Sequence, residues 1–210
     1  MLSSNELYYF NAALDGREIY AVELMENLFN QLEGPNTKED LIKKNLINED
    51  GSINTLSFII IDRLRRYKSA DSYIWVDDKV LAMYDNTYDL VFLQKDKSGE
   101  FIFEDVTKSI MVAGIFKDKP FLLGDKEADD KQIRIRIEDF YERILQFISE
   151  EDMLSLRKMK NNEIDTYNIY FTYDEILFKY NVKRKKLMEI NPKKARKEIL
   201  TLFQVKEWKK

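Results

Sequence analysis

Residues Asp71–Phe116 have the sequence DSYIWVDDKVLAMYDNTYDLVFLQKDKSGEFIFEDVTKSIMVAGIF, and this stretch decides the predicted fold. Four short segments rich in aromatic and β-branched residues are separated by breaks of Asp, Asn and Gly, a pattern typical of antiparallel hairpins. The segments are Tyr73–Val76, Val80–Tyr84, Tyr88–Leu93 and Phe101–Phe103. An apolar run over Val106–Phe116 then predicts a helix. We therefore expect a four-stranded meander followed by a helix that covers one face of its sheet.

The rest of the chain carries periodic segments on both sides of this stretch. Before it, we expect a helix that starts at the capping box Ser3-x-x-Glu6, and then a strand followed by three helices. These four elements are Arg17–Val22, Glu23–Leu32, Lys38–Asn45 and Asn54–Tyr67. After a charged linker over residues 118–131, we expect a strand, two helices, three strands and a last helix. These are Ile133–Ile137, Phe140–Ile148, Glu150–Lys160, Tyr167–Thr172, Glu175–Tyr180, Lys186–Ile190 and Pro192–Val205.

The two halves of the chain follow one pattern of strand, helices, meander and helix. The predicted pseudo-repeats cover residues 17–117 and 132–205, and the Asp77-Asp78 turn falls opposite Asp174-Glu175 in this alignment. Whether the repeat is a true duplication stays open. The fold class that follows is α+β, with a central antiparallel β-sheet, flanking helical groups and a single domain over residues 1–210.

Composition removes several classes of function. The chain has 210 residues, 44% hydrophobic and 34% charged, and it contains no histidine and no cysteine. The residues most used as general bases, nucleophiles and transition-metal ligands are therefore missing. No apolar run approaches the roughly 20 residues of a membrane span, and the N-terminus lacks the features of a signal peptide. We expect a cytoplasmic protein without catalytic residues, cofactor or metal and without membrane insertion.

Carboxylates and basic residues keep two alternatives open. The pairs Asp77-Asp78 and Asp129-Asp130 and the run Glu150-Glu151-Asp152 are the basis for a carboxylate-dependent hydrolase, although turns and helix starts favour the same residues. Residues 183–210 contain eleven Lys or Arg against three Glu. Together with Arg63, Arg65 and Arg66 on a predicted helix, this basic region is the basis for a nucleic-acid-binding regulator. The net charge of −4 argues against nucleic acid as the favoured partner.

Two groups of apolar residues stand where a protein partner could contact them. Trp75 lies on a predicted strand beside an acidic turn, and Phe121, Leu122 and Leu123 lie inside the charged linker. Large apolar side chains in such places are typical anchors of protein interfaces. The alternatives are a Trp75 half-buried in the sheet and a triplet that forms a short strand or a loop packed back on the domain. If the triplet is an anchor, Leu122→Asp with Leu123→Asp weakens partner binding and leaves thermal stability almost intact.

The order of these segments resembles the EspG/EsaE-like accessory proteins of type VII secretion systems. The similar segments are LSSNELYYFNAAL before Gly16, REIYAV, LIKKNLINEDGSINTLSFIIIDRL and SYIWVDDKVLAMYDN running into a meander. The Lys-, Asn- and Ile-rich composition suits the version found in low-GC Gram-positive bacteria.

The resemblance implies a cytoplasmic chaperone without enzymatic activity. Such a protein binds the helical signal region of a secreted protein or toxin and delivers it to the membrane secretion ATPase. A helical hairpin with an apolar tip would dock on the sheet or between the helical groups. Binding of this kind requires no titrating side chain, in agreement with the missing histidine and cysteine.

Overall fold

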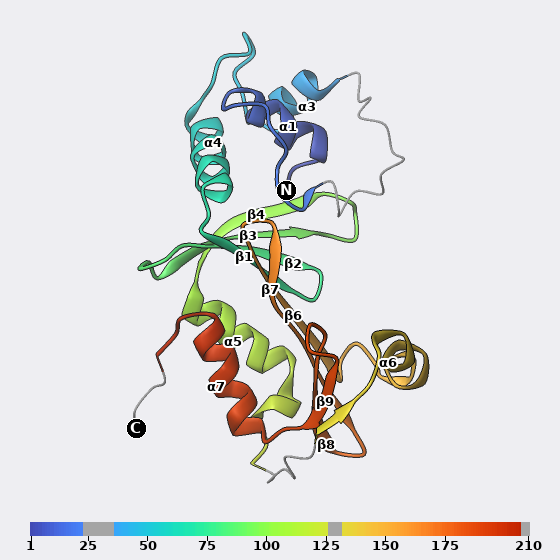
Figure 1. Cartoon of the computed structure of the whole chain (residues 1–210). Helices are drawn as coiled ribbons and strands as arrows, with labels where there is room; N and C mark the ends of the chain where they lie inside the picture. The colour runs from blue at the N-terminus through green and yellow to red at the C-terminus, as the bar shows by residue number, and fades with distance from the viewer. Residues whose placement is uncertain (23–35, 126–131, 207–210) are drawn as a thin grey trace. The chain divides into compact units, whose positions relative to one another are not determined.

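The computed structural model describes residues 1–22, 36–125 and 132–206, and all structural statements concern these residues (Figure 1). They form an antiparallel sheet of nine strands together with six α-helices, which confirms the predicted α+β class. The strands are β1 (Ser72–Val76), β2 (Lys79–Met83), β3 (Asp89–Lys95), β4 (Phe101–Thr107), β5 (Gln132–Arg134), β6 (Met153–Lys160), β7 (Glu163–Tyr173), β8 (Ile176–Asn181) and β9 (Lys186–Glu189). The α-helices are α1 (Ser4–Ala12), α3 (Thr37–Lys43), α4 (Thr55–Lys68), α5 (Lys108–Asp118), α6 (Ile137–Arg143) and α7 (Pro192–Leu202), and the 3-10 segments are η1 (Pro120–Leu123) and η2 (Leu145–Phe147).

The stretch Asp71–Phe116 forms the predicted meander and its helix. Strands β1 to β4 lie on the four expected segments, and α5 begins two residues later than predicted because β4 extends to Thr107. The Thr107 side chain then accepts a hydrogen bond from the Ile110 backbone N–H at 3.3 Å and caps the helix.

The second meander contains one strand more than expected. Residues 150–160, predicted as a helix, form strand β6 instead, so that prediction was wrong. Ser149 does bond to Asp152, but these bonds close a turn, and the helix start that they resemble is absent. The buried residues Leu154 and Leu156 alternate with less buried neighbours, which is the period of a strand.

The strand order explains the repeat and corrects its register. The order is β4-β3-β2-β1-β6-β7-β8-β9-β5, so each meander runs outward from the central β1–β6 pair and is followed by a helix, α5 or α7. In this order β1 corresponds to β6 and β2 to β7. The counterpart of the turn Asp77-Asp78 is therefore Asn161-Asn162. The expected match with Asp174-Glu175 was displaced by one hairpin because β6 was not foreseen.

The N-terminal predictions have mixed outcomes. The capping box forms, with Glu6 N–H donating to Ser3 Oγ at 3.2 Å and Ser3 N–H to Glu6 Oε2 at 2.7 Å. Helices α3 and α4 lie close to their expected bounds. The expected strand over Arg17–Val22 does not form, because Ala21 adopts a φ of 68°, which is incompatible with extended backbone. The predicted helix Glu23–Leu32 lies outside the described residues.

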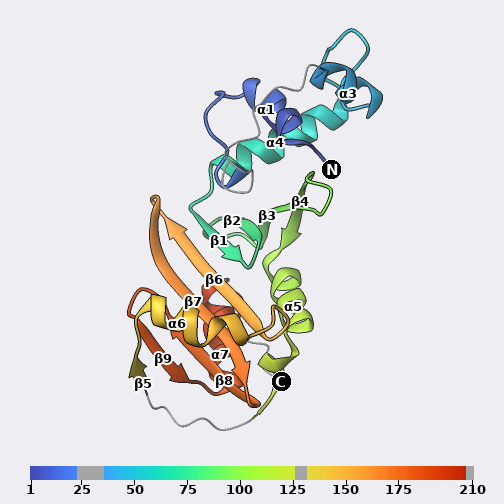
Figure 2. The same cartoon turned by 90° about the vertical axis from the view of Figure 1, so that its right-hand side faces the viewer.

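The chain divides into two compact units. Unit 1 comprises residues 1–71, 78–85 and 90–105, and unit 2 comprises residues 72–77, 86–89 and 106–210. The single domain expected over residues 1–210 stays a prediction. Within unit 2, α6 lies over one face of the strands and α7 over the other (Figure 2). Phe140 of α6 stacks on Tyr180 at 4.1 Å between ring centroids, while Glu198 of α7 accepts a hydrogen bond from the Tyr170 hydroxyl at 2.8 Å.

Candidate functional site

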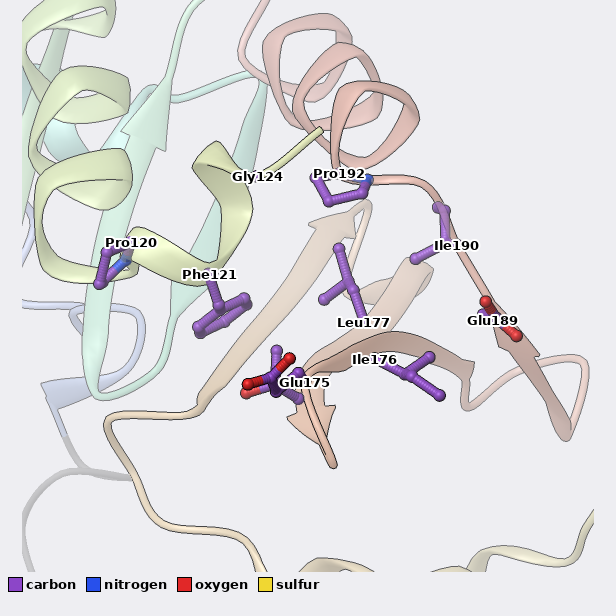
Figure 3. A pocket seen from close by; sticks show the side chains of 10 residues that line it. Pro120, Phe121, Gly124, Glu175, Ile176, Leu177, Glu189, Ile190 and Pro192 are labelled. Atoms are coloured by element: carbon purple, nitrogen blue, oxygen red, sulfur yellow. The ribbon is translucent and has the colours of Figure 1, made fainter. Parts of the chain in front are cut away.

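An apolar groove of about 430 Å³ lies in unit 2, beside the segment predicted as a partner anchor (Figure 3). Its lining combines η1, the turn between β7 and β8, and the junction of β9 with α7. The lining residues are Pro120, Phe121, Gly124, Thr172, Glu175, Ile176, Leu177, Glu189, Ile190 and Pro192. Phe121 and Leu177 point into this space from opposite elements. A groove of this composition suits an apolar side chain of a protein partner.

One wall of the groove is η1, which is fixed firmly to α7. Pro120 stands at the first position of this 3-10 turn, and Leu122 N–H donates to the Lys119 carbonyl at 3.1 Å. Arg196 of α7 donates to the carbonyls of Leu122 at 2.6 Å and Gly124 at 3.0 Å. These bonds satisfy backbone oxygens that the short turn leaves unpaired. The backbone that carries Phe121 is therefore held in place before any partner arrives.

The opposite wall is the β7–β8 hairpin. Asp174 and Glu175 form its two-residue turn with φ values of 49° and 62°, as the tight turns between twisted strands require. Behind the turn, Ile190 N–H donates to the Leu177 carbonyl at 2.9 Å. Pro192 then occupies the first turn of α7, and the Asn191 side chain accepts from Lys193 N–H at 2.8 Å. The predicted start of the last helix is confirmed.

The three residues of the predicted anchor have different environments. Phe121 is half-buried and lines the groove, whereas Leu123 is 53% exposed. Leu122 is completely buried, so its side chain packs inside unit 2 and is not available to a partner. The region is therefore no solvated linker at this point, and the alternative of a loop packed back on the protein holds for Leu122. Partner contact by Phe121 and Leu123 stays a prediction.

Trp75 lies apart from the groove, on a mixed aromatic and cationic surface of the sheet. The Arg157 guanidinium carbon is 4.7 Å from the Trp75 ring centroid and 5.9 Å from that of Tyr167, and the three residues are neighbours across β1, β6 and β7. Tyr141 of α6 joins this surface through a hydrogen bond with Tyr167, and burial together with this bond raises the pKa of Tyr141 to about 12. Trp75 is half-buried in the sheet. Its contact with a partner stays a prediction.

A second apolar groove was not foreseen from the sequence. Its volume is about 540 Å³, and it opens beside α6 and η2. The lining residues are Arg143, Ile144, Phe147, Phe171, Tyr173, Phe178 and Leu187. Phe147 belongs to the segment Phe140–Ile148, which was predicted as one continuous apolar helix. It is 70% exposed, because that helix ends at Arg143 and a 3-10 turn follows. The spacing of apolar residues in the sequence does not predict this end of the helix.

Among the acidic residues behind the hydrolase alternative, Asp77 has a structural partner. Asp77 Oδ1 accepts from Ser155 N–H at 2.7 Å, and Asp77 N–H donates to the Ser155 carbonyl at 2.9 Å. Asp129-Asp130 lies outside the described residues. Within the described ranges, no group of three or more acidic residues could hold a metal ion. In the same ranges, no helix is long and apolar enough to cross a membrane.

The basic residues are distributed between ion pairs and open surface. Arg63 and Arg66 pair with Asp105, and Arg65 pairs with Asp62. In the C-terminal region, Lys183, Arg184 and Lys185 are exposed on the turn between β8 and β9. These three residues therefore form a solvated hairpin turn.

Among the solved structures similar to this chain is the Mycobacterium tuberculosis type VII secretion system chaperone EspG5 in complex with a PE25–PPE41 dimer. The match has a TM-score of 0.54 and 10% sequence identity, and it covers 100% of this chain and 97% of that chain. At this identity the match shows a likeness in fold alone. No curated protein matches the chain. The model of the family described as a domain of unknown function, DUF5081, matches residues 1–208, and the chain therefore belongs to the DUF5081 family.

Proposed function

We propose that the protein is a cytoplasmic chaperone or adaptor without enzymatic activity. It binds an α-helical substrate of a type VII secretion system and targets it for export, with the membrane secretion ATPase as the receiver. The observation that carries this proposal is the likeness in fold, over the whole chain, to a type VII secretion chaperone solved with a PE–PPE dimer.

The groove beside Phe121 supports the proposal physically. A secreted helical protein has to keep an apolar surface away from water until export, and this requires a complementary apolar surface on the chaperone. The groove offers Phe121, Leu177 and Ile190 on a backbone that is already fixed. A preformed site avoids part of the entropy cost of ordering loops on binding. We therefore place the client helix, or the tip of a helical hairpin, in this groove.

The test is purification of the tagged protein from its native host, followed by reconstitution. The expected result is one predominantly helical secreted protein that forms a stable complex with the purified chain in size-exclusion chromatography. Deletion of the chaperone gene should then remove that client from the culture medium and leave its transcript unchanged. A clean monomer that binds DNA with strong salt dependence would replace the proposal with the nucleic-acid alternative.

A further inference from the structure

Carboxylates line the apolar groove or lie close to residues that line it. Glu175 and Glu189 line it directly, and Asp174 shares the β7–β8 turn with Glu175. The run Glu150-Glu151-Asp152 approaches both walls, because the Glu150 carbonyl accepts from Lys119 Nζ at 2.6 Å and the Asp152 carbonyl from Thr172 N–H at 3.0 Å. We call these residues the acidic rim: Glu150, Glu151, Asp152, Asp174, Glu175 and Glu189.

Lys119 and Arg196, two of the cations next to the groove, are held by groups other than the side chains of this rim. Lys119 is only 13% exposed and lies 3.5 Å from Asp77 Oδ2. Arg196 is occupied by the carbonyls of Leu122 and Gly124 and lies 3.5 Å from Asp125. Among the described residues, Glu150, Asp174 and Glu189 form no ion pair. The groove thus combines an apolar floor with several carboxylates at and near its edge.

We propose that the acidic rim selects a client segment in which a bulky apolar side chain is flanked by lysine or arginine. This inference rests on the proposed function and specifies the chemistry of its client. The apolar side chain would fill the space between Phe121 and Leu177. Basic residues three or four positions away on the same helical face would extend their apolar stems along the groove and place their charges at the rim.

The same rim acts against other partners. A nucleic acid or an anionic membrane would meet carboxylates of like charge. An acidic helix with identical apolar residues would lose affinity for the same reason, so the rim contributes specificity as well as attraction. Because part of this attraction acts across water at the edge of the groove, it weakens as salt shortens the range of electrostatic interactions.

Two synthetic helical peptides test the inference on the full chain. Both carry the same Leu and Phe residues on one face, and these residues are flanked by lysines in one peptide and by glutamates in the other. Fluorescence anisotropy at low salt should show about tenfold tighter binding of the lysine peptide, and the difference should shrink at high salt. Equal affinities, or binding of neither peptide, would overturn the inference. The proposed function is tested separately, by reconstitution of the complex with the native client.

Two charge-matched variants locate the effect. Glu175→Lys with Glu189→Lys should abolish or invert the preference for the lysine peptide. Glu163→Lys with Asp165→Lys adds the same charge at the other end of β7, where both residues are exposed, and should leave a clear preference. Circular dichroism checks that both variants are folded. An equal loss in the two variants would show that net charge acts and not the rim, and would contradict the inference.

Discussion

The turn after β1 and the turn after β7 are both acidic, but their surroundings give them different roles. Asp77, in the first, exchanges two hydrogen bonds with Ser155 and lies beside Lys119. Glu175, in the second, is exposed and borders the groove. The segment Lys119–Leu123 touches both regions, with Lys119 directed to Asp77 and Phe121 to the groove. The comparison shows that two acidic residues in a turn indicate a hairpin, whereas their neighbours decide which contacts each residue makes.

The largest expected effect is a difference in stability between two leucine variants of η1, one at a buried position and one at an exposed position. Leu122→Ala should cost about 3 kcal/mol of unfolding free energy, because it leaves a cavity in a fully buried site. Leu123→Ala should cost less than about 0.5 kcal/mol, since that side chain is largely exposed. Urea unfolding of both variants measures the difference. Equal losses would show that the two leucines do not differ in packing. Because Leu122 is fully buried, Leu122→Asp with Leu123→Asp should also lower stability strongly, contrary to the expectation from the sequence.

The next effect compares the two turns directly. Asp77→Ala should lower the unfolding free energy by about 2 kcal/mol, because the Ser155 N–H loses a charged acceptor and Lys119 loses its nearby carboxylate. Glu175→Ala should lower it by less than about 0.5 kcal/mol. Asp77→Asn, which keeps an acceptor and tolerates the φ of 52°, should fall between them. If Glu175→Ala were as unstable as Asp77→Ala, the two turns would contribute equally to stability, contrary to this prediction.

A binding measurement tests which of the two grooves contacts the client. Phe121→Ala should weaken the complex with the native client about tenfold, as truncation of a central aromatic anchor typically does. Phe147→Ala removes the same side chain from the second groove, on the other side of the sheet, and should leave affinity within about twofold. Isothermal titration calorimetry gives both constants. Stronger weakening by Phe147→Ala would move the client surface to the second groove.

The smallest expected effect lies away from both turns. Arg157→Gln should cost about 0.5–1 kcal/mol of unfolding free energy, because it removes the cation–π contact with Trp75. Tryptophan fluorescence should change at the same time, since the guanidinium covers one face of the indole ring. Unchanged stability and fluorescence would show that the contact contributes nothing measurable.

Local signals predicted much of the fold. The capping box at Ser3 and the start of the last helix at Pro192 form as expected, because short-range hydrogen bonds depend on adjacent residues. The error at β6 arose where a local signal was ambiguous, since Ser149 with Asp152 closes a turn as readily as it begins a helix. Pairing with β1 and β7 makes that segment a strand.

The candidate site was only partly predictable. The apolar triplet pointed to Phe121, but its adjacent residue Leu122 is buried through packing with α7, whose Arg196 lies 74 residues further along the chain. The opposite wall, Leu177 and Ile190, was recognised only as strand residues. Glu175 and Glu189 were visible only as separate residues of a turn and a strand, and the pairing of β7, β8 and β9 brings both to one groove.

Hydrogen–deuterium exchange of the full chain, alone and with its purified native client, tests the central claim most directly. We predict slower exchange over residues 119–125, 172–177 and 189–192 in the complex, because the client would cover both walls of the groove. Strands β1 and β6 should change little. Protection confined to the Trp75–Arg157 surface or to the basic turn at residues 183–186, with none at the groove, would contradict it.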